Sequence, residues 1–326
     1  MKTNTEPFNP FLFYSNQLQA LFVKASSQSN PALWLYQNNA RAPLFMLEAL
    51  TRLHDKAFDE TLFAKWNARF KKLEDELGAL DYYMAFEKEF KANKQVSVKV
   101  IKHINDSSLF VLDELNKRLK SKDWFNGKLL RFNVKISKYA FICDDDYADE
   151  ITYTINEELD KIKEFALKLN YSFTQMEEEV HEIRRKLRWI SIYAQAFNGL
   201  FQLKASSKKQ IHSVNYLTKE VLSSPYNKLS TKPKDATIIE FDKNSFLALS
   251  WIINELGKLK DKALAIEALT YSIEVAEQLS IEESRKKALK ILKLKDNTET
   301  TILKEASNSV YSFLVKDKIL DTLIVN

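Results

Sequence analysis

Glycine and proline are scarce in this sequence. The chain of 326 residues contains 4 glycines and 6 prolines, well below the usual shares of ~7% and ~5%. A β-sandwich or barrel needs many tight turns, which these two residues commonly supply. The glycines also stand far apart, so neither a G-x-G-x-x-G loop nor a Walker A loop can be written. The composition therefore disfavours an all-β fold and excludes nucleotide-binding folds of those two kinds.

Cysteine and long hydrophobic runs are also lacking. The single cysteine, Cys143, excludes an internal disulfide and a cysteine-based zinc cluster. No apolar stretch approaches the ~18 residues of a membrane span. The N-terminal segment has one lysine and a short aromatic run broken by Pro10, which is unlike a signal peptide. We therefore expect a soluble, cytoplasmic protein without a membrane partner.

Residue patterns typical of enzymes and metal sites are missing as well. The run Asp144–Asp146 could chelate a hard cation, but it lacks the spacing of an EF-hand, and an acidic helix N-terminus explains it better. No G-x-S-x-G or H-E-x-x-H motif occurs, and three of the histidines are scattered: His54, His103 and His212. We therefore expect no catalytic residues, no metal and no cofactor.

What the sequence does contain is helical periodicity. Apolar residues recur at i, i+3, i+4 and i+7 over most of the chain, and this pattern predicts an all-α fold. Strand candidates are few, and Tyr139–Cys143 and Ala236–Phe241 could each be a short strand or a loop. The predicted helices are Ala42–His54, Leu62–Leu80, Asp106–Leu119, Ile155–Leu169, Met176–Leu203, Asn244–Leu279 and Ser284–Leu294.

Charge of one sign is concentrated in two neighbouring segments. Residues 144–180 contain 12 acidic and 3 basic residues, whereas residues 181–234 contain 11 basic and 2 acidic residues. Within the second segment, residues 204–235 form a basic connection with seven lysines and little periodicity, in which we expect one helix, His212–Leu222. The reversal indicates either an anion-binding surface or two solvated helix faces that neutralise one another.

The segment Val180–Phe197 carries a face of cations. On a helical wheel its apolar residues share one arc, which is typical of a helix that packs one stripe into a core. Successive turns rise by ~5.4 Å, so a ladder of cations on the other arc suits an extended polyanion. Acidic neighbours such as Glu177, Glu178 and Glu182 could instead make this arc an ordinary salt-bridged surface. The cationic arc comprises His181, Arg184, Arg185 and Arg188.

A short pattern occurs in both halves of the chain. Residues 76–81 read ELGALD and residues 255–261 read ELGKLKD, each inside a predicted amphipathic helix. Glycine in the middle of a helix costs roughly 1 kcal/mol relative to alanine. Placing Gly78 and Gly257 alike therefore predicts close helix–helix contact at both positions and suggests an internal repeat.

These motifs together resemble the CHAD family, the conserved histidine α-helical domain. The resemblance rests on a helix reading H-x-x-R-x-x-x-[RK], followed by a helix with L-G-x-x-x-D, and spans roughly residues 28–300. The second half supplies His181, Arg184 and Arg188, then Leu256, Gly257 and Asp261. The first half departs from the pattern: Arg41 and Leu77–Gly78 match, but Asn38 replaces the histidine, Phe45 and Met46 replace the basic pair, and Asp81 comes one position early, with Tyr82 at the expected acid.

The resemblance implies two pseudo-symmetric helical bundles around a basic central cleft. Residues 1–326 would form one module, with a first half at about 28–165 and a second at about 166–326. The family binds inorganic polyphosphate without established catalysis, so His181, Arg184 and Arg188 would line one wall of the cleft and Arg41 the other. Arg185 joins them by the helical wheel. Leu256, Gly257 and Asp261 would be structural, the glycine allowing close helix approach and the aspartate orienting a cation or capping a helix.

The function expected from the sequence is therefore a non-catalytic polyanion-binding module with inorganic polyphosphate as its ligand. Two alternatives remain open. A nucleic-acid binder would use the basic region 204–234, although the aromatic residues follow core spacing and form no stacking platform. A helical scaffold or adaptor for protein–protein interaction would use its acidic and basic segments to bind each other or a partner.

Overall fold

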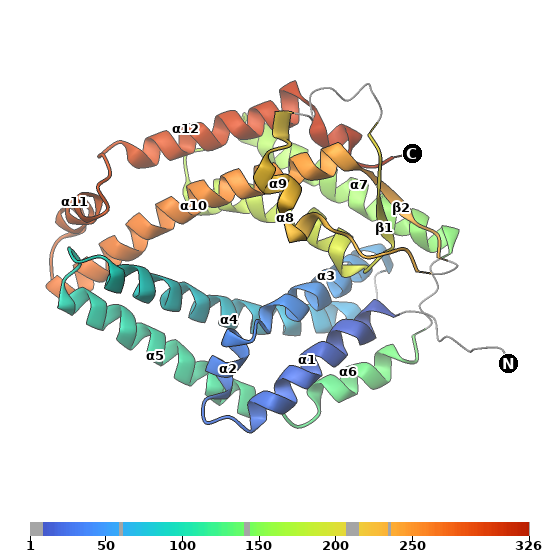
Figure 1. The fold of residues 1–326 in the computed structure, drawn as a ribbon, viewed down its shortest axis with the longest axis horizontal. Helices are drawn as coiled ribbons and strands as arrows, with labels where there is room; N and C mark the ends of the chain where they lie inside the picture. Colours follow the sequence, from blue (N-terminus) through green and yellow to red (C-terminus); the bar gives the residue numbers. More distant parts are fainter. Residues whose placement is uncertain (1–8, 59–60, 140–143, 207–214, 234–235, 326) are drawn as a thin grey trace.

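The computed structural model describes residues 9–58, 61–139, 144–206, 215–233 and 236–325. Within these ranges the chain forms twelve α-helices and two short strands, which confirms the all-α fold (Figure 1). The helices before the middle of the chain are α1 (Pro10–Ser26), α2 (Pro31–Gln37), α3 (Arg41–Phe58), α4 (Thr61–Ala92), α5 (Val98–Ser121), α6 (Lys128–Ile136) and α7 (Asp145–Lys168).

The remaining elements begin with a π-helical turn, Met176–His181, that runs directly into α8. The C-terminal α12 continues into a second π-helical turn, Ser312–Lys316, and a 3₁₀ turn, Ile319–Thr322. The elements are α8 (Glu182–Ala196), β1 (Phe201–Lys204), α9 (Lys219–Ser223), a 3₁₀ turn (Pro225–Asn227), β2 (Ile239–Asp242), α10 (Lys243–Glu277), α11 (Ile281–Ile291) and α12 (Thr298–Tyr311).

Side chains at the helix starts explain where many of the helices begin. Asp144 accepts a hydrogen bond from the backbone N–H of Tyr147, so the acidic run Asp144–Asp146 is the N-terminus of α7, as expected from the sequence. Pro10, which interrupts the N-terminal aromatic run, lies in the first turn of α1, where proline is favoured. Residues that cap other helices are Asn9, Asn30, Ser97, Thr218, Asp242 and Ser280.

The periodicity located some of the helices and missed others, including α1 with 17 residues and α12 with 14. Six of the seven predicted helices lie within, or end within three residues of, α3, α4, α5, α7, α10 and α11. The sequence analysis did not predict α1, α2, α6 and α12. Two of these have only 7 and 9 residues, too few turns for a clear periodic signal.

The prediction of one helix over Met176–Leu203 was wrong at its C-terminal end. The helix stops at Ala196, because Asn198 (φ 44°) and Gly199 (φ 111°) adopt left-handed backbone conformations that end it. The following residues form β1, which pairs in parallel with β2 over the register Phe201↔Ile239 to Lys204↔Asp242. The segment 236–241 thus contains part of a strand, whereas most of Tyr139–Cys143 lies outside the described residues.

The predicted helix His212–Leu222 was wrong over residues 215–218 and right over residues 219–222. Helix α9 begins only at Lys219, after the capping residue Thr218, and ends at Ser223. Residues 212–214 lie outside the described ranges.

Two hydrophobic clusters bring the early and late helices together at two places. The larger cluster includes residues of α1, α3, α4, α7, α8, α10 and α12, and within it α3 packs against α8. A smaller cluster lies at the other end of the long helices, where α4 and α5 pack against α10 and α11. Helices α4 and α10 therefore run between two closed ends (Figure 1).

Candidate functional site

A cleft of about 1600 Å³ lies between the early and late helices. We call its α3–α4 side the first wall and its side formed by α8, α9 and α10 the second wall. Residues far apart in sequence meet here, since Arg41 lies 140 residues before His181. All five residues proposed from the sequence to bind an anion line this cleft: Arg41, His181, Arg184, Arg185 and Arg188.

Helix α8 and the π-helical turn that runs into it position four of these side chains through one amphipathic pattern: His181 ends the turn, and Arg184, Arg185 and Arg188 lie on α8. The apolar arc expected from the helical wheel is buried in the large cluster, with Ile183, Leu187 and Ile190 fully inaccessible. Burial of this stripe fixes the rotation of the helix and turns the opposite arc to the cleft. The wheel analysis is therefore confirmed for α8.

Arg184 lies across Gly257 of α10. Its Nε donates a hydrogen bond to the carbonyl oxygen of Ile253 at 3.1 Å. Burial lowers the pKa of Arg184, and the negative charge of Asp261 opposes that effect. An arginine keeps its proton under all physiological conditions, so Arg184 brings a positive charge and further N–H donors to the cleft.

Arg188 is the second cation on this face that lacks an acidic partner. Its guanidinium lies over the ring of Phe45 on α3, 4.4 Å from the ring centroid. Burial lowers the pKa of Arg188, as do the nearby charges of Arg184 and Arg41, while the negative charge of Glu74 opposes them. Among the described residues, no ion pair is formed by Arg184 or Arg188. These two guanidinium groups are half-buried, and their positive charge is therefore not neutralised by an ion pair within the described residues.

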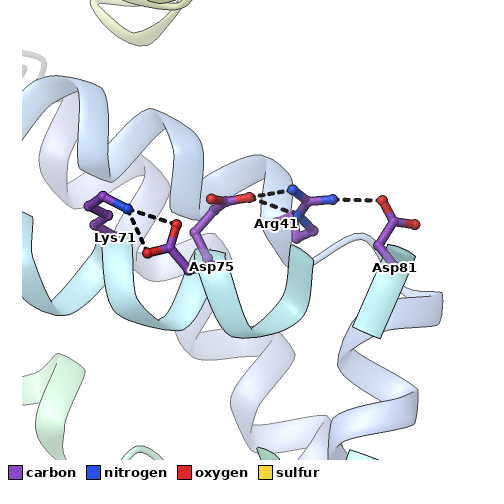
Figure 2. Close-up of polar contacts among 5 residues, drawn as sticks. Arg41, Lys71, Asp75 and Asp81 are labelled. Atoms are coloured by element: carbon purple, nitrogen blue, oxygen red, sulfur yellow. Dashed lines mark hydrogen bonds and ion pairs between the residues drawn. The ribbon is translucent and has the colours of Figure 1, made fainter. Parts of the chain in front are cut away.

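Arg41 faces the cleft from α3 but is already neutralised. Its Nε and Nη2 donate to Oε1 of Glu74 at 2.9 and 2.5 Å, and its Nη1 donates to Asp81 at 2.7 Å. Figure 2 shows the contact with Asp81, together with the neighbouring pair of Lys71 and Asp75. A cation held by two carboxylates has little attraction left for an anionic ligand.

His181 and Arg185 also have acidic partners, which belong to their own helical segment. Nδ1 of His181 lies 2.8 Å from Glu177, and Arg185 forms an ion pair with Glu182. The salt-bridged surface that the sequence left open is therefore present for these two residues, although not for Arg184 and Arg188.

The two glycines accommodate arginine side chains and not a neighbouring helix backbone. A Cβ atom on Gly78 would lie 3.0 Å from Nη2 of Arg41, and one on Gly257 would lie 3.1 Å from Nε and Nη2 of Arg184. Close helix–helix contact was expected at these glycines, and at each one an arginine of the neighbouring packed helix lies against the glycine: Arg41 of α3 on α4, and Arg184 of α8 on α10. Leu256 is buried in the core, and Asp261 is exposed beside Lys260.

The cleft as a whole is electrically balanced. Its lining contains seven basic residues, counting histidine as neutral, and seven acidic ones. The expectation of a basic cleft therefore applies only to the second wall, where Arg184, Arg185, Arg188 and Lys260 face Glu220 and Asp261. On the first wall the acidic residues outnumber Arg41, Arg52 and Lys71; they are Glu48, Glu74, Asp75, Asp81 and Glu89.

Sequence analysis missed Glu48 and Arg52 in the first wall. Glu48 is 2% exposed, and its Oε2 has no hydrogen-bond partner among the described residues. Burial, followed by the charge of Glu74, raises the pKa of Glu48 to about 7. Arg52 lies over the ring of Trp189, 4.9 Å from its centroid. The sequence feature that could have revealed them is a pair of opposite charges four residues apart within a largely apolar helical stretch.

Over its described residues, the basic connection contributes no lysine or arginine to the lining of the cleft. It reaches the lining through residues between Glu220 and Tyr226, and this stretch contains no lysine or arginine. Lys204, at its beginning, forms an ion pair with Glu240 on β2.

The parts of the chain that the structure describes hold no group of three or more histidine, cysteine, aspartate or glutamate residues placed to bind a metal ion. Within those same parts, no helix has the length and apolar character needed to cross a membrane. Comparison of the chain with family profiles, curated proteins and solved structures finds no match.

Proposed function

We propose that this protein is a non-catalytic, CHAD-like module that binds a phosphate chain, with inorganic polyphosphate as its ligand, and that it acts in the cytoplasm. The observation that carries the proposal is the pair Arg184 and Arg188. Both are held by the core-packed α8, both face the cleft, and neither forms an ion pair among the described residues.

The chemistry of binding would be charge-assisted hydrogen bonding. Guanidinium groups present a planar fork of donors that matches phosphate oxygens. Their spacing along α8 is one turn, so neighbouring phosphates of one chain can be bound by Arg184 and Arg188 together. Because such binding releases counterions, affinity should fall as salt rises.

The two arginine–glycine contacts support the proposed internal repeat. Arg41 lies on Gly78 and Arg184 on Gly257, so each half contributes one arginine laid across a glycine of a long helix. The halves differ in what surrounds that arginine: two carboxylates bind Arg41, whereas no carboxylate of the described residues binds Arg184. We propose that phosphate binding is retained mainly by the second half.

The test is calorimetric titration of the full chain with tripolyphosphate and with long-chain polyphosphate, at low and at physiological salt. Arg184→Gln and Arg188→Gln should each weaken binding about tenfold, because each removes charge-assisted hydrogen bonds. Arg131→Gln is the matched control, since Arg131 is an exposed arginine paired with Asp123 outside the cleft. The Arg131→Gln variant should bind both phosphate ligands with the affinity of the wild type.

A helical scaffold is the second candidate function, and the charge balance of the cleft favours it. If a scaffold is the correct function, the wild type binds no phosphate chain, and Arg184→Gln changes stability or assembly only. Equal binding of polyphosphate and length-matched DNA, unaffected by both cleft variants, would instead support a nucleic-acid binder. Either result would overturn the polyphosphate proposal.

A further inference from the structure

The opposite charge of the two walls is a difficulty for a bare polyanion. Phosphates held by Arg184 and Arg188 on the second wall would face a first wall on which five acidic residues outnumber three basic ones. Part of that negative charge is neutralised, because Glu74 and Asp81 both form ion pairs with Arg41. Three carboxylates of the first wall do not bind Arg41, namely Glu48, Asp75 and Glu89. Of these, Glu48 and Asp75 lie close enough for the charge of Asp75 to act on Glu48.

Among the residues that the structure describes, Glu48 has no counter-charge bound to it. It lines the cleft, it is almost completely buried, and its Oε2 has no hydrogen-bond partner among the described residues. The charged or titratable groups that face it are Arg52 on its own helix, Lys71, Glu74 and Asp75 on α4, and Tyr193 on α8. A buried carboxylate left unpaired is costly, so this position favours the arrival of a cation.

Asp75 adds a second available carboxylate on the neighbouring helix. It forms an ion pair with Lys71, and the side chains of Asp75 and Lys71 are about half exposed, at 55% and 48%. Exposed pairs of this kind contribute about 0–1 kcal/mol, so Lys71 can be displaced easily. Asp75 also lies close enough to Glu48 for its charge to raise the pKa of that residue.

Phosphate chains bring cations of a suitable kind with them. Mg²⁺ is usually bound through one or two carboxylates together with the phosphates of a ligand, and it keeps several of its waters. The described residues hold no cluster that could bind a metal alone. A cation delivered by the ligand therefore fits this cleft better than a resident metal ion.

We propose that the ligand of the cleft is a magnesium complex of a phosphate chain, in which Arg184 and Arg188 bind phosphate oxygens while Glu48 and Asp75 bind the hydrated Mg²⁺. This inference rests on the proposed function. It assigns a role to the acidic wall, which polyphosphate binding alone leaves unexplained. It also distinguishes the cleft from a purely cationic site, where Mg²⁺ weakens binding because it neutralises the ligand.

The experiment titrates tripolyphosphate into the full chain at constant ionic strength, once with EDTA and once with excess MgCl₂. Mg²⁺ should raise the affinity of the wild type by about tenfold, the effect of gaining contacts to charged groups. In Glu48→Gln and Asp75→Asn the stimulation should be lost, while metal-free binding should equal or exceed that of the wild type. Asp123→Asn, which removes an exposed carboxylate outside the cleft, should keep the full stimulation.

The two proposals fail in different ways. If the wild type binds tripolyphosphate equally well or less well with Mg²⁺, or if the acidic variants keep the stimulation, the magnesium inference is overturned and the phosphate site stands. If tripolyphosphate does not bind under either condition, the proposed function fails and the inference fails with it. Circular dichroism of the variants confirms that each comparison is made on folded protein.

Discussion

Burial acts in opposite directions on two ionisable side chains of α3. It raises the pKa of Glu48 to about 7 and lowers the pKa of His54 to about 4, because a buried site disfavours whichever form is charged. His54 is held neutral by its contacts: Nδ1 donates to the Leu50 carbonyl at 2.7 Å, and Nε2 accepts from the hydroxyl of Tyr147 at 2.8 Å. His54 is therefore a buried core residue, whereas His181 in the cleft is partly exposed.

These two shifts predict opposed effects of pH on stability. Below its ordinary pKa of 6.5, the unfolded chain protonates His54 more readily than the folded one, so stability from this residue is lost as pH falls toward 4. Glu48 gains its proton first in the folded state, so it adds stability as pH falls below about 7. Each effect amounts to about 2 kcal/mol between pH 7 and pH 5, and they nearly cancel.

Urea denaturation of wild type, His54→Gln and Glu48→Gln at pH 7 and pH 5 separates the two effects. Relative to the wild type, His54→Gln should gain about 2 kcal/mol on acidification, and Glu48→Gln should lose about as much. Variants that follow the wild type at both pH values would show that neither group is neutralised by burial.

At the scale of the element, the cleft depends on contacts in which an arginine of one helix lies on a glycine of the next. Gly257 in α10 lies beneath Arg184 of α8, and Gly78 in α4 lies beneath Arg41 of α3. Glycine lowers the stability of a helix relative to alanine. Because it has no side chain, however, the guanidinium of the arginine can lie directly against the helix surface. The same arginine–glycine contact has different consequences in the two halves, because two carboxylates bind Arg41 and, in the part of the chain that the structure describes, none binds Arg184.

Gly257→Ala should therefore separate stability from binding. The new Cβ, 3.1 Å from two guanidinium nitrogens, displaces a flexible side chain, and alanine favours the helix by up to about 1 kcal/mol. We expect an unchanged or higher melting temperature, together with tripolyphosphate affinity lowered about threefold to tenfold. Gly78→Ala is the control: it displaces Arg41, which is already neutralised, and should leave binding nearly unchanged. Unaltered binding in Gly257→Ala would remove Arg184 from the site.

At the scale of the whole molecule, two separate cores hold the cleft open between them. The large cluster closes one end through α3 and α8, and the smaller cluster closes the other through α4, α5, α10 and α11. The small cluster contains few residues, so we expect it to be the less stable of the two ends. Cleft geometry then depends on both clusters, although the proposed anion-binding arginines all come from elements of the larger one.

Leu269→Ala should reveal this division. Leu269 is fully buried in the smaller cluster, and removing such a side chain costs about 2–5 kcal/mol. Hydrogen exchange should accelerate in α5 and α11, while α3 and α8 keep their protection. Leu187→Ala, a fully buried residue of the larger cluster, should show the reverse distribution. Equal loss of protection throughout the chain in both variants would indicate one cooperative unit.

Local pattern was enough to predict the helical fold and the arginine face of α8. Apolar residues at helical spacing determine which side of a segment is buried, and this requires no knowledge of its partner. For that reason Arg184 and Arg188 could be selected before their surroundings were known. The end of α8 escaped prediction because the left-handed conformations of Asn198 and Gly199 are set by one or two residues, which a periodic signal does not reveal.

By itself, then, the sequence determined the helical class of the fold, the core-facing stripe of α8 and the position of its cations. Only the tertiary structure decided which of those cations keep their charge available. Arg41 meets Glu74 and Asp81 from 33 and 40 residues away, and Glu48 loses its solvent because α4 and α8 pack over α3. Ion pairing and desolvation depend on the register between separate helices, so no single segment of the sequence contains that information.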